Sequence, residues 1–383
     1  MPRYIGLDLH ADYIHGCEWT PDATDDQKER HFQFPTTQKG WSRLINQLNA
    51  DCWVALEVPG DAFDLYDMLS PHAGQVLLAN PIGLKRLGSG RHTDRVDAAR
   101  LAKMLAVGTV PTVWVPPHQV REMRRLLHYR DRLGRTRRRF VLQAKAILRN
   151  RGHRLSRHDD LQSWVTPAQL HAFSATDQVL LRSTLRQIGA LEEEIATLET
   201  EIAAHATTVP AVSLLMTLPG MGMIIATATW ATLGDAGRFA TAKSVTRYVG
   251  LDPSVVQSGD QHRQGRISKN GSRFLRTLLV EAANTVAHHD KGPLGQFYQH
   301  MRERRGHKKA VVALARKLLI IAWRMLQTGE VYRNANPAAV ARKHRDLRKM
   351  ALRHDSTQPV GQTEKDIPVT TRPPIHTRTP VPA

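Results

Sequence analysis

Four acidic residues near the N-terminus have the types and the spacing that metal-assisted chemistry requires. Asp8 lies in the apolar run 4–9, and Glu57 ends a second apolar run. Asp94 and Asp97 are about one turn apart in a segment with helical spacing, so we expect both on one face of a helix. Hard divalent ions prefer such oxygen ligands, and two carboxylates per ion leave room for water and phosphate. These residues therefore predict a Mg²⁺ site.

Two strand carboxylates that face two helix carboxylates are the arrangement of the metal site in a ribonuclease-H-like fold. Two ions about 3.5–4 Å apart can there activate a nucleophile and stabilise the leaving oxygen of a phosphodiester. Taken singly, Asp94 could merely complement a helix N-terminus, and Asp8 could simply end a strand. The four acids together, in a strongly basic chain, favour two Mg²⁺ ions and chemistry on nucleic acid.

The composition indicates a polyanionic partner. The 383 residues include 54 Lys and Arg against 35 Asp and Glu, a formal net charge of +19. Such a surface attracts nucleic acid, and no amphipathic anchor indicates a membrane instead. The N-terminus lacks a signal-peptide pattern, and no apolar stretch is long enough to span a bilayer. Cys17 and Cys52 have no metal-type pair spacing and are typical of core thiols in a reducing compartment, so we expect a cytoplasmic protein.

An alternation of strands and helices over residues 1–112 must position the four acids. Apolar patterns predict strands over 4–9, 14–19, 52–58 and 75–79 and helices over 40–48, 62–69 and 94–105. Thr93 is a suitable N-cap for the last of these helices. The pattern predicts an α/β domain with a mixed sheet.

Residues 118–207 are predicted to form a basic helical arm. From Leu181 to Ile202, apolar residues recur in steps of three and four, as in a heptad seam. An antiparallel hairpin within one chain and a coiled coil between subunits both fit this seam. We expect the basic residues of the arm to contact nucleic-acid backbones, among them Arg124, Arg125, Arg137, Arg138, Arg139 and Lys145.

A third region, residues 210–330, opens with a helix, a turn that carries Gly220 and Gly222, and a second helix. This pattern is similar to a helix-hairpin-helix element, whose free backbone N–H groups can bind a phosphate, although a plain helical turn fits it as well. Residues 331–383 are basic and then rich in Pro and Thr, so we expect a disordered tail there.

A second candidate site within the third region is the pair Ser258-Gly259, which reads as part of a flexible loop. Four cations follow Ser258 closely in the sequence, namely Arg263, Arg266, Lys269 and Arg273. Such cations stabilise a transferring phosphoryl group, and an exposed serine among them could attack phosphorus. A loop that only binds a phosphate, without a nucleophile, fits the same residues. Taken alone, the serine and its neighbouring cations favour this phosphate-binding loop.

The order of these motifs resembles that of the DEDD transposases of bacterial insertion sequences, the IS110 family with its IS1111 branch. The resemblance covers about residues 3–330 and leaves the Pro-rich tail outside. It rests on Gly6-Leu7-Asp8, Leu56-Glu57, Thr93-Asp94-Arg95-Val96-Asp97-Ala98, Leu218-Pro219-Gly220-Met221-Gly222, Gly250-Leu251-Asp252-Pro253, Ser258-Gly259 and the segment Gly265 to Gly271.

The resemblance implies a RuvC-like N-terminal domain, a coiled-coil arm and a mainly helical C-terminal transposase domain with a nucleophilic serine. It assigns that serine to Ser258, with Ser254 and Ser268 as fallback candidates. Family members look like recombinases that join DNA transiently to the serine, act as oligomers (dimers or tetramers), and use a bridge RNA to specify donor and target DNA. By motif, the metal ligands are Asp8, Glu57, Asp94 and Asp97.

Two other classes of function remain open. A junction-resolving nuclease of the same fold would use water as its nucleophile and would leave no protein–DNA adduct. A non-enzymatic architectural or RNA-binding protein would bind without metal dependence and cleave nothing. The sequence also leaves open whether the carboxylates of one subunit act with the serine of another.

Overall fold

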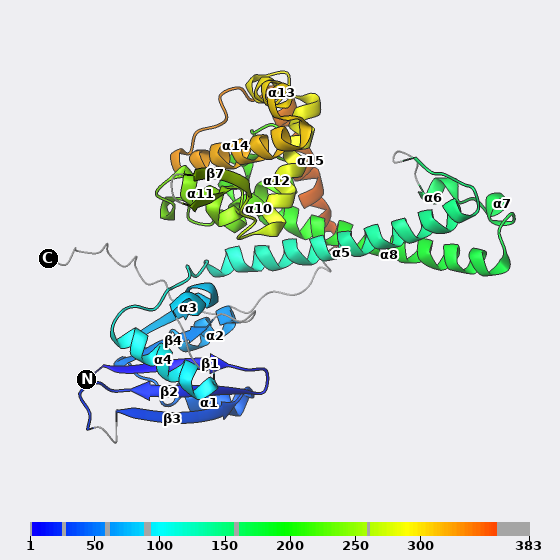
Figure 1. Ribbon diagram of the computed structural model, residues 1–383. Helices are drawn as coiled ribbons and strands as arrows, with labels where there is room; N and C mark the ends of the chain where they lie inside the picture. Colours follow the sequence, from blue (N-terminus) through cyan, green and yellow to red (C-terminus); the bar gives the residue numbers. More distant parts are fainter. Residues whose placement is uncertain are drawn as a thin grey trace. The chain divides into compact units, whose positions relative to one another are not determined.

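The chain divides into two compact units, Met1–Pro117 and His118–Ala383. The computed structural model describes residues 2–24, 28–57, 62–87, 93–156, 161–258 and 261–357 (Figure 1). Among the helices in these ranges, none is long and apolar enough to cross a membrane.

The first unit is built on a five-stranded sheet of order β3-β2-β1-β4-β5. Strands β1, β2 and β3 pair antiparallel, whereas β4 runs parallel to both β1 and β5. The predicted α/β unit with a mixed sheet is confirmed, and it fits a RuvC-like domain. The strands are Arg3–Leu9 (β1), Tyr13–Trp19 (β2), Glu29–Pro35 (β3), Cys52–Glu57 (β4) and Gln75–Ala79 (β5).

Successive side chains of β1 point to opposite faces of the sheet. Ile5 and Leu7 belong to a buried cluster with residues of β4, α1 and α2. Gly6 and Asp8 therefore face the other side, where α4 packs against β1 and β2. A Cβ atom on Gly6 would lie 2.1 Å from the carbonyl oxygen of Ala98, so only glycine lets α4 lie this close to β1. The helices are Gln38–Ile45 (α1), Ala62–Leu69 (α2), Pro81–Leu87 (α3) and Asp94–Ala106 (α4).

Two elements of this unit were not predicted. No position of the edge strand β3 is fully buried, and its apolar alternation is limited to Phe32 and Phe34, which is too short a signal to predict a strand. Helix α3 starts at Pro81, in a segment where the apolar pattern predicted no helix. Asn80 caps this helix, because its side-chain Oδ1 accepts hydrogen bonds from the backbone N–H of Ile82 (3.0 Å) and Gly83 (3.3 Å).

The arm of the second unit is an antiparallel pair of long helices, α5 (His118–Asn150) and α8 (Ala175–Thr207) (Figure 1). Between them lie the short helices α6 (Leu161–Trp164) and α7 (Pro167–Leu170). Of the heptad seam, Leu181, Thr184, Ile188 and Ile202 are buried within the chain, whereas Leu191, Ile195 and Leu198 are partly exposed. The chain itself therefore forms the hairpin, and a coiled coil between subunits stays a prediction. Ion pairs also join the two helices along their length, namely Arg130 with Glu199 (2.9 Å), Arg137 with Glu192 (2.6 Å) and Arg151 with Asp177 (2.7 Å).

The rest of the second unit is mainly helical and shares one large buried cluster. Only one short hairpin of strands, β6 with β7, interrupts the helices described there. The elements are Pro210–Leu215 (α9), Met223–Leu233 (α10), Ala242–Val249 (α11), Pro253–Ser258 (β6), Gln261–Ile267 (β7), Arg273–His289 (α12), Pro293–Arg305 (α13), His307–Thr328 (α14) and Pro337–Thr357 (α15).

Helix α15 departs from the expectation of a tail that starts at residue 331. Leu347 is 5% exposed and joins the main cluster, and Lys343 donates from Nζ to the carbonyl oxygens of Met216 (2.8 Å) and Leu218 (3.0 Å). The sequence signal was weak because few apolar residues stand among many cations. Residues 358–383 lie outside the described residues, so the Pro- and Thr-rich tail stays a prediction.

Candidate metal centre and nucleic-acid interface

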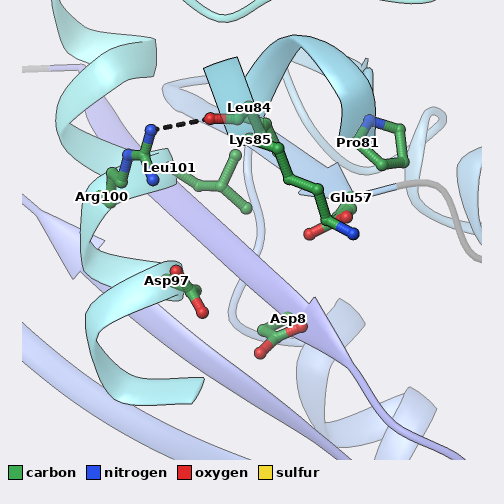
Figure 2. A pocket seen from close by; sticks show the side chains of 8 residues that line it. All are labelled: Asp8, Glu57, Pro81, Leu84, Lys85, Asp97, Arg100 and Leu101. Atoms are coloured by element: carbon green, nitrogen blue, oxygen red, sulfur yellow. Dashed lines mark hydrogen bonds between the residues drawn. The ribbon is translucent and has the colours of Figure 1, made fainter. Parts of the chain in front are cut away.

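Three of the four predicted carboxylates line one cavity of about 340 Å³ in the first unit (Figure 2). Asp8 lies near the end of β1, and Glu57 is the last residue of the parallel neighbour β4. Asp97 lies in the first turn of α4, where Thr93 accepts a hydrogen bond at its Oγ1 from the backbone N–H of Val96 at 3.3 Å. The full lining is Asp8, Glu57, Pro81, Leu84, Lys85, Asp97, Arg100 and Leu101.

The fourth acid, Asp94, joins this group through His10. The Nε2 atom of His10 lies 3.3 Å from Oδ2 of Asp8 and 3.3 Å from Oδ2 of Asp94. One possible ligand atom from each of these three residues lies within 4.8 Å of the others. All four acids are thus gathered around Asp8.

The electrostatics of Asp8 fit a site that takes up a cation. Burial raises the pKa of the Asp8 carboxyl, His10 lowers it, and the negative charges of Asp94 and Asp97 raise it further, with a net upward shift. His10 lies between two of these acids, with Nε2 at 3.3 Å from a carboxylate oxygen of each. A hard cation would relieve the repulsion among the carboxylates. The donor set therefore fits Mg²⁺.

Sequence reasoning missed His10 and Tyr13, which position Asp94. The Tyr13 hydroxyl donates to Oδ2 of Asp94 at 2.6 Å, and this bond holds the pKa of Asp94 below its ordinary value. His10 could have been predicted, because it lies two residues after Asp8, and side chains two residues apart in a strand point to the same face of a sheet. Tyr13 offered none, because its contact depends on how the β1–β2 hairpin meets α4.

Replacing Tyr13 with phenylalanine should weaken metal binding without abolishing it. The variant loses the hydrogen bond that orients Asp94, and loss of such supporting bonds typically costs about 10–100-fold in metal affinity. Isothermal titration of Mg²⁺ against wild type and Tyr13→Phe measures the change. Tyr66→Phe, on α2, is the matched control and should leave the affinity unchanged.

Two cations line the same cavity as the acids. The Arg100 guanidinium donates from Nη2 to the carbonyl oxygen of Leu84 at 2.9 Å, which ties α4 to α3. Lys85 extends from α3 toward Glu57 (Figure 2). Positive charge beside the carboxylates suits a phosphate that approaches a bound metal.

The segment around Ser258 is a β-hairpin, so the expectation of a flexible loop was wrong for residues 253–258 and 261–267. Ser258 ends β6, where its backbone pairs with Gln261 of β7, and Arg263 lies opposite Val256. Gly259 lies outside the described residues. The sequence signal was missed because polar residues and glycine interrupt the alternation.

The two fallback serines are engaged in contacts within the chain. The Ser254 hydroxyl donates to the carbonyl oxygen of Arg266 at 2.7 Å, and the Ser268 hydroxyl donates to Oδ1 of Asp252 at 2.5 Å. The first bond joins β6 to β7, and the second joins the residues that flank the two strands. Arg266, Lys269 and Arg273 are exposed beside these segments.

The predicted nucleic-acid residues of the arm fall into two groups. Arg137 and Arg138 of α5 and Arg273 of α12 line one cavity of about 690 Å³, and Arg139 is exposed on the same helix. Arg137 also pairs with Glu192, and the remaining residues make contacts within the chain as well. Arg124 donates from Nε to the carbonyl of Ala231 (2.6 Å) and from Nη2 to that of Thr232 (3.0 Å), Arg125 pairs with Glu122 (3.0 Å), and Lys145 donates to the carbonyl of Ser156 (3.0 Å).

Arg124 and Arg138 should therefore respond differently to replacement. Arg124→Ala removes the cap from the last carbonyls of α10 and should cost about 2–3 kcal/mol of unfolding free energy. Arg138→Ala should leave stability unchanged but lower the salt dependence of nucleic-acid binding by about one phosphate contact. Chemical denaturation and binding at several salt concentrations separate the two effects.

The predicted turn between α9 and α10 is present, and its two glycines have different surroundings. Gly220 has φ of +77°, and a Cβ there would lie 2.6 Å from the carbonyl oxygen of Ala282, so this glycine lets the turn pack on α12. Gly222 is the N-cap of α10 and has open space where a side chain would be. Both line a cavity of about 350 Å³ together with Lys343. Phosphate binding at this turn stays a prediction.

Comparison with known proteins follows the same division of the chain. A family model described as a transposase, for the DEDD domain of the IS110 type, matches residues 5–151. A second, described as "Transposase IS116/IS110/IS902 family", matches residues 212–299. The first range contains all four carboxylates, and the second contains Ser258 and its hairpin.

Curated relatives match over most of their own length. A "Probable family 20 transposase" of Pseudomonas aeruginosa is 29% identical over 74% of this chain and 86% of its own. The "Transposase for insertion sequence element IS1111A" of Coxiella burnetii is 24% identical over 86% of this chain and 91% of its own. The "Transposase for insertion sequence element IS1328" of Yersinia enterocolitica is 26% identical over 86% of this chain and 98% of its own. The chain belongs to the IS110 family of insertion-sequence transposases.

Proposed function

We propose that this transposase cleaves DNA in a Mg²⁺-dependent reaction and exchanges strands through a covalent link to Ser258. The observation that carries the proposal is the gathering of three further carboxylates around Asp8, two of which share its cavity. A basic surface alone would support only binding. Carboxylates that repel one another beside cations support chemistry on a phosphodiester.

The residues of the first unit would hold the metal and the reacting phosphate. Asp8, Glu57, Asp94 and Asp97 would supply oxygen ligands for two Mg²⁺ ions, which would activate the nucleophile and stabilise the leaving oxygen. Tyr13 and His10 would orient Asp94. Arg100 and Lys85 would hold phosphate oxygens close to the carboxylates.

The second unit would supply the nucleophile. Oγ of Ser258 would bond to the scissile phosphorus while the bond from phosphorus to the leaving sugar oxygen breaks. The hydroxyl proton would pass to solvent, and the leaving oxygen would take up a proton. Ser258 is the serine that the family resemblance assigns, and the hydroxyls of Ser254 and Ser268 make hydrogen bonds within the chain. Since the phosphodiester is conserved in the adduct, a free hydroxyl of a second strand can reverse the step and join the strands.

The proposal extends to partners that the family resemblance implies. A bridge RNA would specify donor and target DNA by base pairing, as in other guided systems. The exposed arginines of the arm and the basic segments beside the hairpin would bind the backbones of both nucleic acids. A homo-oligomer, dimer or tetramer, would bring two DNA partners together. Mass measurement of the protein with bound RNA tests this assembly.

The test of the function is a reconstituted recombination reaction. Purified protein is incubated with donor DNA, target DNA and RNA transcribed from the non-coding ends of the element, in Mg²⁺ or in EDTA. We expect joined donor–target products only with both Mg²⁺ and RNA. Nicks without joining would indicate a junction-resolving nuclease, and metal-independent binding without cleavage would indicate a non-enzymatic protein.

A further inference from the structure

A second group of potential metal ligands lies in the first unit, separate from the four carboxylates. Cys17 of β2 and Glu29 and His31 of β3 each place one ligand atom within 4.8 Å of the others. Cys17 and His31 are directly opposite in the β2–β3 ladder, and Glu29 precedes His31 by two residues. Side chains at such positions share one face of a sheet, so the strand register itself brings the three together.

The surroundings of this group are ordered and mostly buried. Cys17 is fully buried and packs against Ala98 and Ala99 of α4. The His31 side chain is 9% exposed, and its Nε2 lies 2.8 Å from Oε1 of Glu29. The other carboxylate oxygen of Glu29 pairs with Nζ of Lys103 at 2.6 Å. The Glu29 oxygen that faces His31 is therefore the one left for a further ligand contact.

His15 completes the arrangement from behind His31. Its Nε2 lies 3.1 Å from Nδ1 of His31. A histidine that binds a metal through Nε2 keeps its proton on Nδ1 and usually donates it to a fixed acceptor, which sets the ring orientation. His15 occupies the position of that acceptor.

We propose that Cys17, Glu29 and His31 form a Zn²⁺ site that fastens the edge strand β3 to β2. Thiolate, imidazole and carboxylate are the ligands that Zn²⁺ takes in proteins, and water would fill a fourth position. The ion replaces the proton between His31 and Glu29, which moves to Nδ1 of His31, and Cys17 releases its thiol proton to solvent. One proton leaves the protein for each ion bound.

Sulfur distinguishes this site from the carboxylate centre. Hard Mg²⁺ selects the oxygen ligands around Asp8, whereas a thiolate selects a softer ion such as Zn²⁺. The proposal is independent of the strand-exchange activity, since it rests on residues that take no part in that reaction scheme. Because β3 is at the edge of the sheet, a bound ion there adds stability to the first unit.

Co²⁺ serves as the probe, because it takes Zn²⁺ sites and a bound thiolate gives it a sulfur-to-metal charge-transfer absorption. Full-length protein, stripped of metal with chelator, is titrated with Co²⁺. We expect one equivalent to produce the charge-transfer band and Zn²⁺ to abolish it by displacement. Cys17→Ser should lose the band. Cys52→Ser, which changes the other buried cysteine, should keep it, and so should Asp8→Asn.

The wild-type titration alone can overturn the proposal, so it does not depend on a variant that folds. Folded wild-type protein without a charge-transfer band has no thiolate metal site. A band that survives Cys17→Ser, with the far-ultraviolet circular dichroism of wild type, would assign the sulfur ligand elsewhere. Raised thermal stability on Zn²⁺ addition in wild type but not in Cys17→Ser would support the structural role.

Discussion

Replacing Asp8 with asparagine should abolish Mg²⁺-dependent DNA cleavage and, at neutral pH, make the metal-free protein more stable. Asp8 is the acid around which the other three gather, so its loss removes several kcal/mol of transition-state stabilisation. That loss corresponds to at least about a thousandfold in rate. The amide of asparagine keeps the shape of the side chain but carries no charge to repel Asp94 and Asp97.

The sign of the stability change follows from the pKa of Asp8. Burial and neighbouring acids raise this pKa above the unfolded value. Asp8 therefore contributes stability below its ordinary titration range, and this contribution is lost as the pH rises through the raised pKa. At neutral pH the carboxylate opposes folding until a cation binds. Asp8→Asn removes this opposition and with it the pH dependence.

A cleavage assay on labelled DNA in Mg²⁺ measures the first part of this prediction, and thermal melting in EDTA and in Mg²⁺ measures the stability change. Wild type should melt higher in Mg²⁺, while Asp8→Asn should melt higher than wild type in EDTA and gain nothing from Mg²⁺. Asp64→Asn changes an exposed acid of α2 and should behave as wild type. Equal Mg²⁺ stabilisation of Asp8→Asn and wild type would remove Asp8 from the metal site.

Ser258→Ala should eliminate the protein–DNA adduct and strand joining while Mg²⁺ binding stays at the wild-type level. Loss of a covalent nucleophile commonly costs several orders of magnitude in turnover. The metal ligands belong to the other compact unit, so this change should not reach them. Denaturing electrophoresis of labelled donor DNA detects the adduct, and calorimetric titration measures Mg²⁺ binding.

The fallback serines supply matched controls for this second prediction. Ser254→Ala loses one hydrogen bond within the chain and Ser268→Ala loses two, which should cost about 1 kcal/mol of stability per bond but leave the adduct in place. An adduct that persists in Ser258→Ala and disappears in one of the others would reassign the nucleophile.

The strongly patterned elements of the first unit could be predicted from the sequence. The apolar runs that end near Asp8 and at Glu57, and the Thr93 cap before Asp94, placed three of the site's segments correctly. The convergence of the acids depended on the sheet order, which no local pattern encodes. Gly6 is an example of a residue whose role depends on the tertiary structure. Only the packing of α4 against β1 shows that a side chain at this position would clash.

Elements stabilised by distant contacts were the ones that sequence patterns missed. Edge strand β3 and the β6–β7 hairpin have weak alternation and are held by pairing with their neighbours. Helix α15 is fixed by Leu347 and by the bonds of Lys343 to a turn far back in the chain. The same limit applies to the predicted nucleic-acid contacts. Sequence alone does not distinguish Arg124, which caps α10, from a basic residue that faces solvent.

The central claim is that metal held by the four carboxylates drives attack by Ser258 on DNA. Mass spectrometry of peptides from a reaction stopped in mid-course tests it most directly. Protein incubated with labelled donor DNA, RNA and Mg²⁺ is digested with nuclease and protease. The account predicts a nucleotide attached to Ser258, absent in EDTA and in Asp8→Asn. Cleaved DNA without any modified serine would contradict it and would indicate hydrolysis by water.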